Sequence, residues 1–408
     1  MPTVHPTASP TAAGVPAHPS VGAATNLLDA YRPGQRFLAT PTRTLLAEGV
    51  HAEVPDDGRP LPERVRSAVA RAAGSGHVRP LVMGSIPFAP DAPAALVVPR
   101  SVSEGPPLAA DPLIALPPEP ASGARWTVTP VPEPEVYGRG VEDAVRRMRA
   151  GEFDKVVLAR SLELASDAPL DLPAMLQRLA RRDPGAYNFA LPTGAGRTLV
   201  GASPELLVSR RGERLVANPL AGSTPRSADL AEDVSRAAAL LRSAKDLHEH
   251  AVVVDAMRRA LAPYTSDLVV PERPTLIRTA TMWHLSTTIT ATVARPDLTA
   301  LELAAALHPT PAVCGTPTDI ARRVIGETEQ FDRGFFTGMV GWQDAAGDGE
   351  WVVTIRCAEA EEAGGPSGGG RLRLYAGAGI VADSRPEEET AETAAKFRTF
   401  LQAVGVAL

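Results

Sequence analysis

Two stretches near the C-terminus decide the expected fold: GMVGWQDAAGDGEWVVTIRCA at residues 338–358 and RLRLYAGAGI at residues 371–380. Their apolar residues come in runs of strand length, and Gly- and Asp-rich segments separate the runs. We interpret residues 338–342, 350–358 and 371–380 as strands of one antiparallel sheet. Residues 364–370 would then form a hairpin turn.

The sequence upstream repeats this pattern of paired short strands. Residues 186–191 and 198–201 predict one hairpin, and residues 203–209 and 213–217 predict another. Further strands are expected at residues 79–88, 95–100 and 156–164. Because strands follow one another in hairpins rather than in strand–helix–strand units, we predict an α+β fold. It would contain large antiparallel β-sheets with helices packed outside them.

The expected helices and loops lie between these strands. The helices are residues 61–73, 137–151, 172–182, 230–261 with a break near Asp246, 302–307, 319–326 and 386–404. Residues 101–125, rich in Pro, Ser and Gly, are expected to form a long loop. Residues 1–26 lack the basic start and apolar run of a secretory signal, and we expect a disordered tail there. Residues 27–130 would form the N-terminal part of the fold.

Composition excludes several classes of protein. The chain has 408 residues, 44% of them apolar, a formal net charge of −6 and a pI near 5.8. Such an acidic chain lacks the basic balance of a nucleic-acid-binding protein, and no apolar run approaches the ~20 residues of a membrane helix. The two cysteines, Cys314 and Cys357, are too few for a disulfide framework. We interpret them as small buried residues of a protein in the reducing cytoplasm.

Lysine is rare in this chain. Of 41 basic residues, only Lys155, Lys245 and Lys396 are lysines, and the rest are arginines. Arginine stays protonated in proteins, whereas a buried lysine can lose its proton and act as a base. Each remaining lysine is therefore a candidate for chemistry, although retention by chance is the ordinary alternative.

Two glutamates in the C-terminal helix form the first candidate site. Glu389 and Glu392 are three residues apart, so they share one face of the helix. Two carboxylates on one face can bind a hard divalent cation such as Mg²⁺. The alternative is a solvated acidic first turn, which the helix dipole favours.

The segment KDLHEHAVVV at residues 245–254 offers a third carboxylate. A zinc-protease motif would need a second histidine at position 252, where this chain has valine. Glu249 begins an apolar stretch, so a buried or half-buried carboxylate is one reading. A capping or surface role for Glu249 is the alternative.

Glu205 and Lys155 are the candidates for proton transfer. Glu205 lies between a turn and an apolar strand, and a carboxyl group in apolar surroundings has a raised pKa and can act as an acid. Lys155 begins a strand, and desolvation would lower the pKa of its amine and make it a base. Each residue could equally be a surface charge at the end of a strand.

Two glycine-containing segments could contact a ligand. NPLAGSTPR at residues 218–226 offers backbone donors and hydroxyls suited to an anion, although an ordinary loop would have the same composition. YAGAGI at residues 375–380 would let the backbone approach a ligand closely, because glycine has no Cβ. No helix with the dinucleotide fingerprint follows it, so we exclude a dinucleotide site.

Taken in order, these segments resemble the chorismate-utilising enzymes: isochorismate synthase, anthranilate synthase component I, aminodeoxychorismate synthase and salicylate synthase. The matching pieces are KVVLAR from Lys155, GASPE from Gly201, PLAGSTPR from Pro219, KDLHEH from Lys245, MWHL from Met282, HPTPAVCGTP from His308, GMVGW from Gly338, IRCA from Ile355, YAGAGIV from Tyr375 and ETAET from Glu389. Ten motifs in the family's order are far more specific than any one of them. They span about residues 135–400, so residues 131–408 would be the chorismate-binding catalytic region.

The resemblance implies a set of ligand contacts, with chorismate as the small-molecule substrate. Mg²⁺ would bind the ring carboxylate and would be held by Glu249, Glu389 and Glu392. Arg356 would pair with the enolpyruvyl carboxylate, because a guanidinium matches a carboxylate with two hydrogen bonds. The other substrate-binding residues implied by the resemblance are Gly222, Ser223, Thr224, His308, Thr310, Ala312, Ile355, Tyr375, Gly377 and Gly379.

The resemblance also implies the catalytic pair and narrows the activity. Lys155 would take a proton from the water that attacks C2 of the ring, and Glu205 would protonate the departing 4-hydroxyl. Anthranilate synthases lack the lysine that corresponds to Lys155, so its presence favours water over ammonia. Aminodeoxychorismate synthases carry a lysine at the position of Ala221, so a covalent amine nucleophile is disfavoured. Relatives often have a larger residue at the position of Thr390, which leaves the packing there open.

The segments at residues 282–285 and 313–317 resemble siderophore-type isochorismate synthases. We therefore expect Mg²⁺-dependent conversion of chorismate to isochorismate, by a monomer without an obligate protein partner. The alternatives are a salicylate synthase, an aminating enzyme of the anthranilate synthase type, and a catalytically inactive homologue that only binds. The product could serve menaquinone, a catechol siderophore, salicylate or another metabolite.

Overall fold

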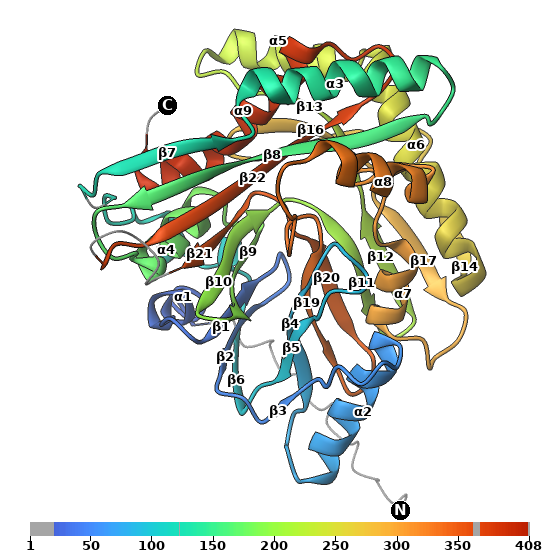
Figure 1. Cartoon of the computed structure of the whole chain (residues 1–408). Coiled ribbons are helices and arrows are strands. Elements are labelled where there is room, and N and C mark those ends of the chain that lie inside the picture. The colour runs from blue at the N-terminus through green and yellow to red at the C-terminus, as the bar shows by residue number, and fades with distance from the viewer. Residues whose placement is uncertain (1–19, 122, 362–367, 407–408) are drawn as a thin grey trace, which may run out of the picture.

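The computed structural model of the chain describes residues 20–121, 123–361 and 368–406. In this part of the chain, two large antiparallel sheets and a small third sheet lie inside a layer of helices (Figure 1). The predicted α+β class with external helices is confirmed. Among the helices of the described ranges, none is both long and apolar enough to cross a membrane.

The first large sheet has the strand order β18-β8-β22-β21-β10-β9-β1-β2-β6, and β7 pairs with β8 beside it. Its strands are β1 (Arg36–Ala39), β2 (Thr44–Glu48), β6 (Ser101–Gly105), β7 (Trp126–Val131), β8 (Lys155–Ser166), β9 (Tyr187–Gly194), β10 (Arg197–Ser203), β18 (Gly315–Thr316), β21 (Cys357–Glu361) and β22 (Arg371–Ile380).

The second large sheet has the order β14-β17-β12-β11-β20-β19-β4-β5-β3, and the third sheet has the order β13-β16-β15. The second contains β3 (Ala52–Glu53), β4 (Leu81–Ile86), β5 (Ala95–Val98), β11 (Leu206–Arg211), β12 (Arg214–Asn218), β14 (Thr265–Val269), β17 (Ile289–Val293), β19 (Met339–Asp344) and β20 (Gly349–Val353). The third contains β13 (Leu220–Pro225), β15 (Thr275–Arg278) and β16 (Met282–Ser286).

The helices of the described part are α1 (Thr25–Ala30), α2 (Leu61–Gly74), α3 (Pro134–Arg149), α4 (Leu172–Arg182), α5 (Leu230–Leu240), α6 (Ala244–Leu261), α7 (Ala300–Leu307), α8 (Thr318–Thr328) and α9 (Pro386–Val404). Local sequence explains several of their ends. Pro386 occupies the first turn of α9, and Gly405 ends this helix with a φ of 77°, a conformation that glycine adopts without strain. The Ser243 side chain accepts a hydrogen bond from the Asp246 N–H and begins α6.

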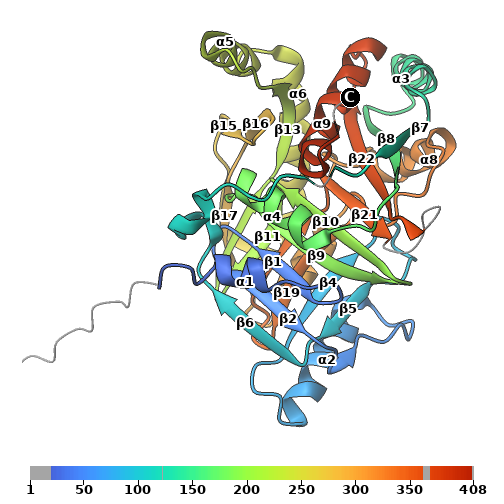
Figure 2. The ribbon, with the colours of Figure 1, turned by 90° about the vertical axis from the view of Figure 1, so that its left-hand side faces the viewer.

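Successive side chains of a strand point to opposite faces, so the strands of the first sheet contribute to two hydrophobic cores. On β9, Tyr187, Phe189 and Leu191 belong to the core between the two large sheets. Ala190, on the opposite face of this strand, packs into the core that α1, α4 and α9 form on the first sheet. The helices α2, α6 and α7 cover the outer face of the second sheet. Figure 1 shows α9 beside β22 and β8, and Figure 2 shows the same helix beside β22 from another side.

The sequence pattern predicted that the strands near the C-terminus belong to one sheet, and this prediction was wrong. β19 and β20 belong to the second sheet, whereas β21 and β22 belong to the first. The chain crosses between the sheets at residues 354–356, where Arg356 has a φ of 52°. A continuous strand 350–358 was therefore wrong, because alternation specifies the faces of a strand but not the sheet that it joins.

The other sequence expectations met mixed outcomes. The hairpins β9–β10 and β11–β12 are confirmed, and the long helix is broken at residues 241–243, just before Asp246. The expected loop at residues 101–125 was partly wrong, since it contains β6 and two short 3₁₀ helices, Leu108–Ala110 and Pro112–Ala115.

Two expectations fall partly outside the described residues. Residues 1–19 of the expected tail and residues 362–367 around the expected hairpin turn lie outside them. The tail was placed too far along the chain, because Ala24 and Thr25 are buried at the start of α1. Asp111 holds this segment by accepting hydrogen bonds from the backbone N–H groups of Gly22, Ala24 and Thr25.

Candidate active site

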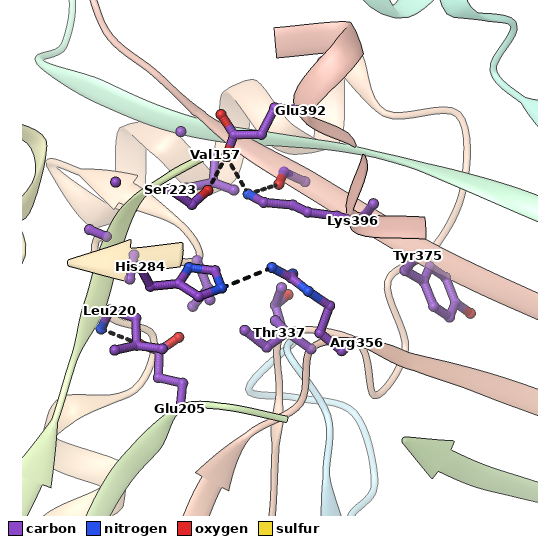
Figure 3. Close-up of a pocket in the computed structure, with 18 of the residues that line it drawn as sticks. Val157, Glu205, Leu220, Ser223, His284, Thr337, Arg356, Tyr375, Glu392 and Lys396 are labelled. Atoms are coloured by element: carbon purple, nitrogen blue, oxygen red, sulfur yellow. Dashed lines mark hydrogen bonds and ion pairs between the residues drawn. The ribbon is translucent and has the colours of Figure 1, made fainter. Parts of the chain in front are cut away.

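A pocket lies where β8 and β22 meet β13, α6 and the C-terminal helix α9 (Figure 3). Most of the predicted site residues line it: Glu205, Gly222, Ser223, Glu249, Ala312, Ile355, Arg356, Tyr375, Gly377, Gly379 and Glu392. The structure therefore brings together residues from seven of the ten motifs, which lie far apart in the chain.

Other lining residues were not in the predicted set: Val157, Leu220, Ala221, His284, Val313, Phe336, Thr337, Ala376 and Lys396. Two of them carried a signal in the sequence. His284 stands in the MWHL segment, and Lys396 is one of only three lysines, four residues after Glu392 on the same helix. The apolar residues carried no signal that separates them from ordinary core.

Lys155 and Glu249 meet beside Gly379. The Lys155 Nζ lies 2.9 Å from the Glu249 Oε1, and the lysine side chain is 1% exposed. A Cβ on Gly379 would lie 2.2 Å from the same carboxylate oxygen and 3.1 Å from the Lys155 Cε. The close contact of β22 with this ion pair therefore requires glycine at position 379.

Glu205 lies directly before β11 begins, and in Figure 3 it is at the end of the pocket away from Glu392. Burial raises the pKa of its carboxyl group to about 7, and the hydrogen bond from the Leu220 N–H opposes this rise. The positive charges of Lys155 and Arg356 also oppose it. The balance leaves a carboxyl group that is partly protonated near neutral pH and can donate a proton.

Arg356 and His284 point toward one another across the pocket (Figure 3). Arg356 Nη2 lies 3.5 Å from His284 Nε2. Burial and the charge of Arg356 lower the pKa of His284 well below its ordinary value, so the imidazole is neutral. Burial lowers the pKa of Arg356 to about 10, which leaves it protonated. Among the described residues its Nε has no hydrogen-bond partner, so this buried cation can accept an anionic ligand.

Each lysine of the chain pairs with one predicted metal-binding glutamate. Besides Lys155–Glu249, Lys245 Nζ lies 2.7 Å from Glu389 Oε1, and Lys396 Nζ lies 2.6 Å from Glu392 Oε1. Burial, followed by the charge of Glu392, raises the pKa of Glu389. Burial alone would raise the pKa of Glu392, but Lys396 and hydrogen bonds lower it.

These carboxylates do not form a ready-made metal centre. No group of three or more His, Cys, Asp or Glu side chains within the described ranges is close enough to hold an ion. The donor set nevertheless suits a hard divalent cation, because Glu249, Glu389 and Glu392 offer carboxylate oxygens that already contact cationic side chains, those of Lys155, Lys245 and Lys396.

Lys396 connects the C-terminal helix to β22. Its Nζ donates a 2.7 Å hydrogen bond to the Gly377 carbonyl and contacts Glu392. The Ser223 hydroxyl donates to the same Glu392 carboxylate at 2.9 Å. Thr390, between the two glutamates, donates its hydroxyl to the Pro386 carbonyl, so this smaller residue has a local partner within the helix.

Five predicted residues do not line the pocket. Lys155 and Glu389 lie behind it, in their ion pairs with other site residues. His308 is bonded through Nε2 to the Thr337 carbonyl at 2.8 Å, and burial lowers its pKa to about 4. Thr310 is buried, and its hydroxyl has no hydrogen-bond partner among the described residues. Thr224 follows Ser223 on β13 and is not among the residues that line the pocket.

Comparison with known proteins agrees with this geometry. The family model "Chorismate binding enzyme" matches residues 115–405. Isochorismate synthase DhbC of Bacillus subtilis is 54% identical, over 94% of this chain and 96% of that relative. The vibriobactin-specific isochorismate synthase of Vibrio cholerae is 42% identical, over 91% of this chain and 92% of that relative.

A solved structure is also similar. The crystal structure of DhbC from Bacillus anthracis, assigned as a 2,3-dihydroxybenzoate-specific isochorismate synthase, superposes with a TM-score of 0.86. It is 46% identical and covers 94% of this chain and 100% of that chain.

Proposed function

The chain belongs to the chorismate-binding enzyme family, and we propose that it is an isochorismate synthase. Water would add at C2 of the chorismate ring, the ring double bonds would shift, and the C4 hydroxyl would leave as water. Substrate and product then have the same mass. Glu205 carries this proposal, because a pocket-lining carboxyl with a pKa of about 7 can protonate a leaving hydroxyl.

We assign the opposite role to Lys155. Its buried amine contacts Glu249 and lies beside Gly379, two residues that line the pocket, whereas Glu205 lines the pocket beside Leu220. A base and an acid at different positions around one pocket suit a reaction that adds a hydroxyl to one ring carbon and removes it from another.

Arg356 is the proposed partner of a substrate carboxylate. Its guanidinium is buried and charged, its Nε has no partner among the described residues, and neutral His284 does not compensate its charge. A carboxylate would supply both the charge and the hydrogen-bond acceptors that are missing there. Backbone groups near Gly222 and Gly377 would contact the other end of the substrate.

Mg²⁺ is the proposed cofactor, with Glu249, Glu389 and Glu392 as the residues that would hold it. The all-carboxylate donor set fits this hard cation. When bound, Mg²⁺ would neutralise and orient the ring carboxylate. To bind the ion, these carboxylates would have to leave Lys155, Lys245 and Lys396, which they contact in this structure.

We further propose that the product serves the synthesis of a catechol siderophore, because one relative is named vibriobactin-specific and the solved structure is named 2,3-dihydroxybenzoate-specific. We also propose a monomer that needs no protein partner and acts in the cytoplasm. Free, buried Cys314 and Cys357 suit such a reducing compartment.

The direct test is to incubate the purified protein with chorismate and Mg²⁺ and to identify the products by chromatography and mass spectrometry. An isomer of unchanged mass in equilibrium with chorismate is expected, and Lys155→Ala should abolish it. Salicylate with pyruvate would instead identify a salicylate synthase, and an ammonia-dependent product an aminating enzyme. No turnover would identify an inactive homologue.

A further inference from the structure

One edge of β8 has a gap directly behind the pocket. β18 pairs with Lys155 and Val156, and β7 pairs with β8 only from Ser161 onward. Between these two neighbours, the Val157 carbonyl and the Ala159 N–H face no strand of the described structure. Unpaired backbone groups in a buried place are destabilising, so another partner is needed there.

The side chains of Glu329 and Arg333 fill this gap. Glu329 Oε1 accepts a 2.8 Å hydrogen bond from the Ala159 N–H. Arg333 Nη2 donates a 2.8 Å hydrogen bond to the Val157 carbonyl. The two side chains are 2% and 3% exposed and form a two-pronged ion pair, with Arg333 Nε 2.8 Å from Glu329 Oε2.

The same guanidinium reaches two other walls of the pocket. Arg333 Nη1 donates to the Val313 carbonyl at 2.8 Å and to the Thr337 hydroxyl at 3.2 Å. Val157, Val313 and Thr337 all line the pocket, whereas Arg333 and Glu329 do not. One buried side chain thus ties three walls of the site together from behind.

The geometry of this contact is specific to arginine. Five hydrogen bonds leave the Arg333 guanidinium, one from Nε and two from each terminal nitrogen. These account for all five N–H groups of the side chain. A lysine has three donors and lacks the planar fork, so it cannot hold the same set of acceptors.

We infer that Glu329 and Arg333 are positioning residues of the active site, which fix β8 with Lys155 against the walls at residues 313 and 337. This inference rests on the proposed function, since it concerns the geometry of the same reaction. Neither residue would touch the substrate. Their loss should therefore reduce kcat more than it changes KM for chorismate.

Arg333→Lys tests the inference, with Arg210→Lys as a matched control. Arg210 is also buried and contacts one carboxylate, Asp348, and two backbone carbonyls, but none of its partners lines the pocket. Arg333→Lys should lower kcat roughly 10- to 100-fold with KM changed less than about threefold. Arg210→Lys should keep the wild-type kcat at a similar loss of thermal stability.

Glu329→Gln provides a milder variant in case Arg333→Lys does not fold. A neutral amide is a weaker acceptor than a carboxylate, so hydrogen–deuterium exchange of residues 157–159 should become faster than in the wild type. Arg210→Lys should leave that exchange unchanged. If the pair acts as a unit, Arg333→Lys combined with Glu329→Gln should lose little more activity than Arg333→Lys alone.

Two results would overturn the inference. One is an equal kcat per folded molecule in Arg333→Lys and Arg210→Lys. The other is a Glu329→Gln protein with unchanged kcat and unchanged exchange at residues 157–159. A wild type that does not convert chorismate would refute the proposed function instead, and the exchange comparison would still test the positioning.

Discussion

Lys155 and Glu249 form a buried ion pair, with 2.9 Å between Nζ and Oε1, although one is the proposed base and the other a proposed metal ligand. Removing either partner from such a pair leaves an uncompensated buried charge. The contact thus keeps both groups in place beside β22.

The first prediction concerns the backbone beside this pair. Gly379→Ala should lower kcat on the order of 100-fold, because its Cβ would overlap Glu249 Oε1 and displace the pair. Gly138→Ala in α3 is the control, since its Cβ would approach nothing closer than 3.7 Å and Gly138 does not line the pocket. Steady-state kinetics of the two variants should differ strongly, and equal losses would contradict the argument.

The second prediction concerns the pH dependence of catalysis. The protonated carboxyl of Glu205 is the active form of an acid, and its pKa is about 7. Activity in the wild type should therefore fall as pH rises through about 7. Glu205→Gln should lower kcat about 10²- to 10⁴-fold and remove this alkaline limb. The measurement is kcat against pH. If Glu205→Gln keeps the decrease of activity at high pH, another group causes that decrease.

The third prediction concerns stability and uses the same carboxyl. Its pKa is about 7 in the folded protein against an ordinary value of 4.5, so between these pH values the folded state binds the extra proton. Stability should then fall as pH rises from about 4.5 to 7, by up to about 3 kcal/mol from this group. The free energy of unfolding of the wild type should therefore decrease between pH 5 and pH 8, whereas that of Glu205→Gln should lack this decrease. Urea unfolding of both proteins at the two pH values measures it. If the difference in stability between the two proteins does not change with pH, the pKa of Glu205 is not raised.

The fourth prediction concerns substrate binding. Arg356→Gln should weaken binding of chorismate roughly 10- to 100-fold, because it removes a charge-assisted contact with a carboxylate. The change should appear in the dissociation constant measured by calorimetry. Arg373→Gln, an exposed arginine on β22 paired with Glu163, is the control and should bind normally. Undiminished binding by Arg356→Gln would assign the carboxylate to another partner.

The fifth prediction concerns the metal. A chelator should abolish activity and added Mg²⁺ should restore it. Glu392→Gln should raise the Mg²⁺ concentration for half-maximal activity about tenfold or more. Glu388→Gln removes an exposed carboxylate from the same helix and should have no effect. The stabilisation of each protein by Mg²⁺ in thermal unfolding should follow the same order, and full activity in chelator would exclude the cofactor.

Local sequence was sufficient for most elements of the fold and for much of the site. Hairpin spacing predicted β9–β10 and β11–β12, and the Pro386 start fixed α9. The order of short motifs predicted Glu205, Arg356 and Gly379 as site residues, and all three line the pocket. The scarcity of lysine pointed to Lys155, Lys245 and Lys396, each of which contacts a site glutamate.

Long-range relationships were decided only by the tertiary structure. Alternation fixes which face of a strand is buried, but the pairing partner depends on packing, so residues 350–358 divide between two sheets at Arg356. His284 reaches Arg356 only because the third sheet packs there. No sequence pattern distinguished Arg333. Its contacts depend on the tertiary structure, because Arg333 and Glu329 bond two backbone groups of β8 that no neighbouring strand of the described structure pairs. The sequence by itself determined which chemical groups the chain offers. The tertiary structure determined which of them meet, since burial, pairing and charge depend on neighbours from distant segments.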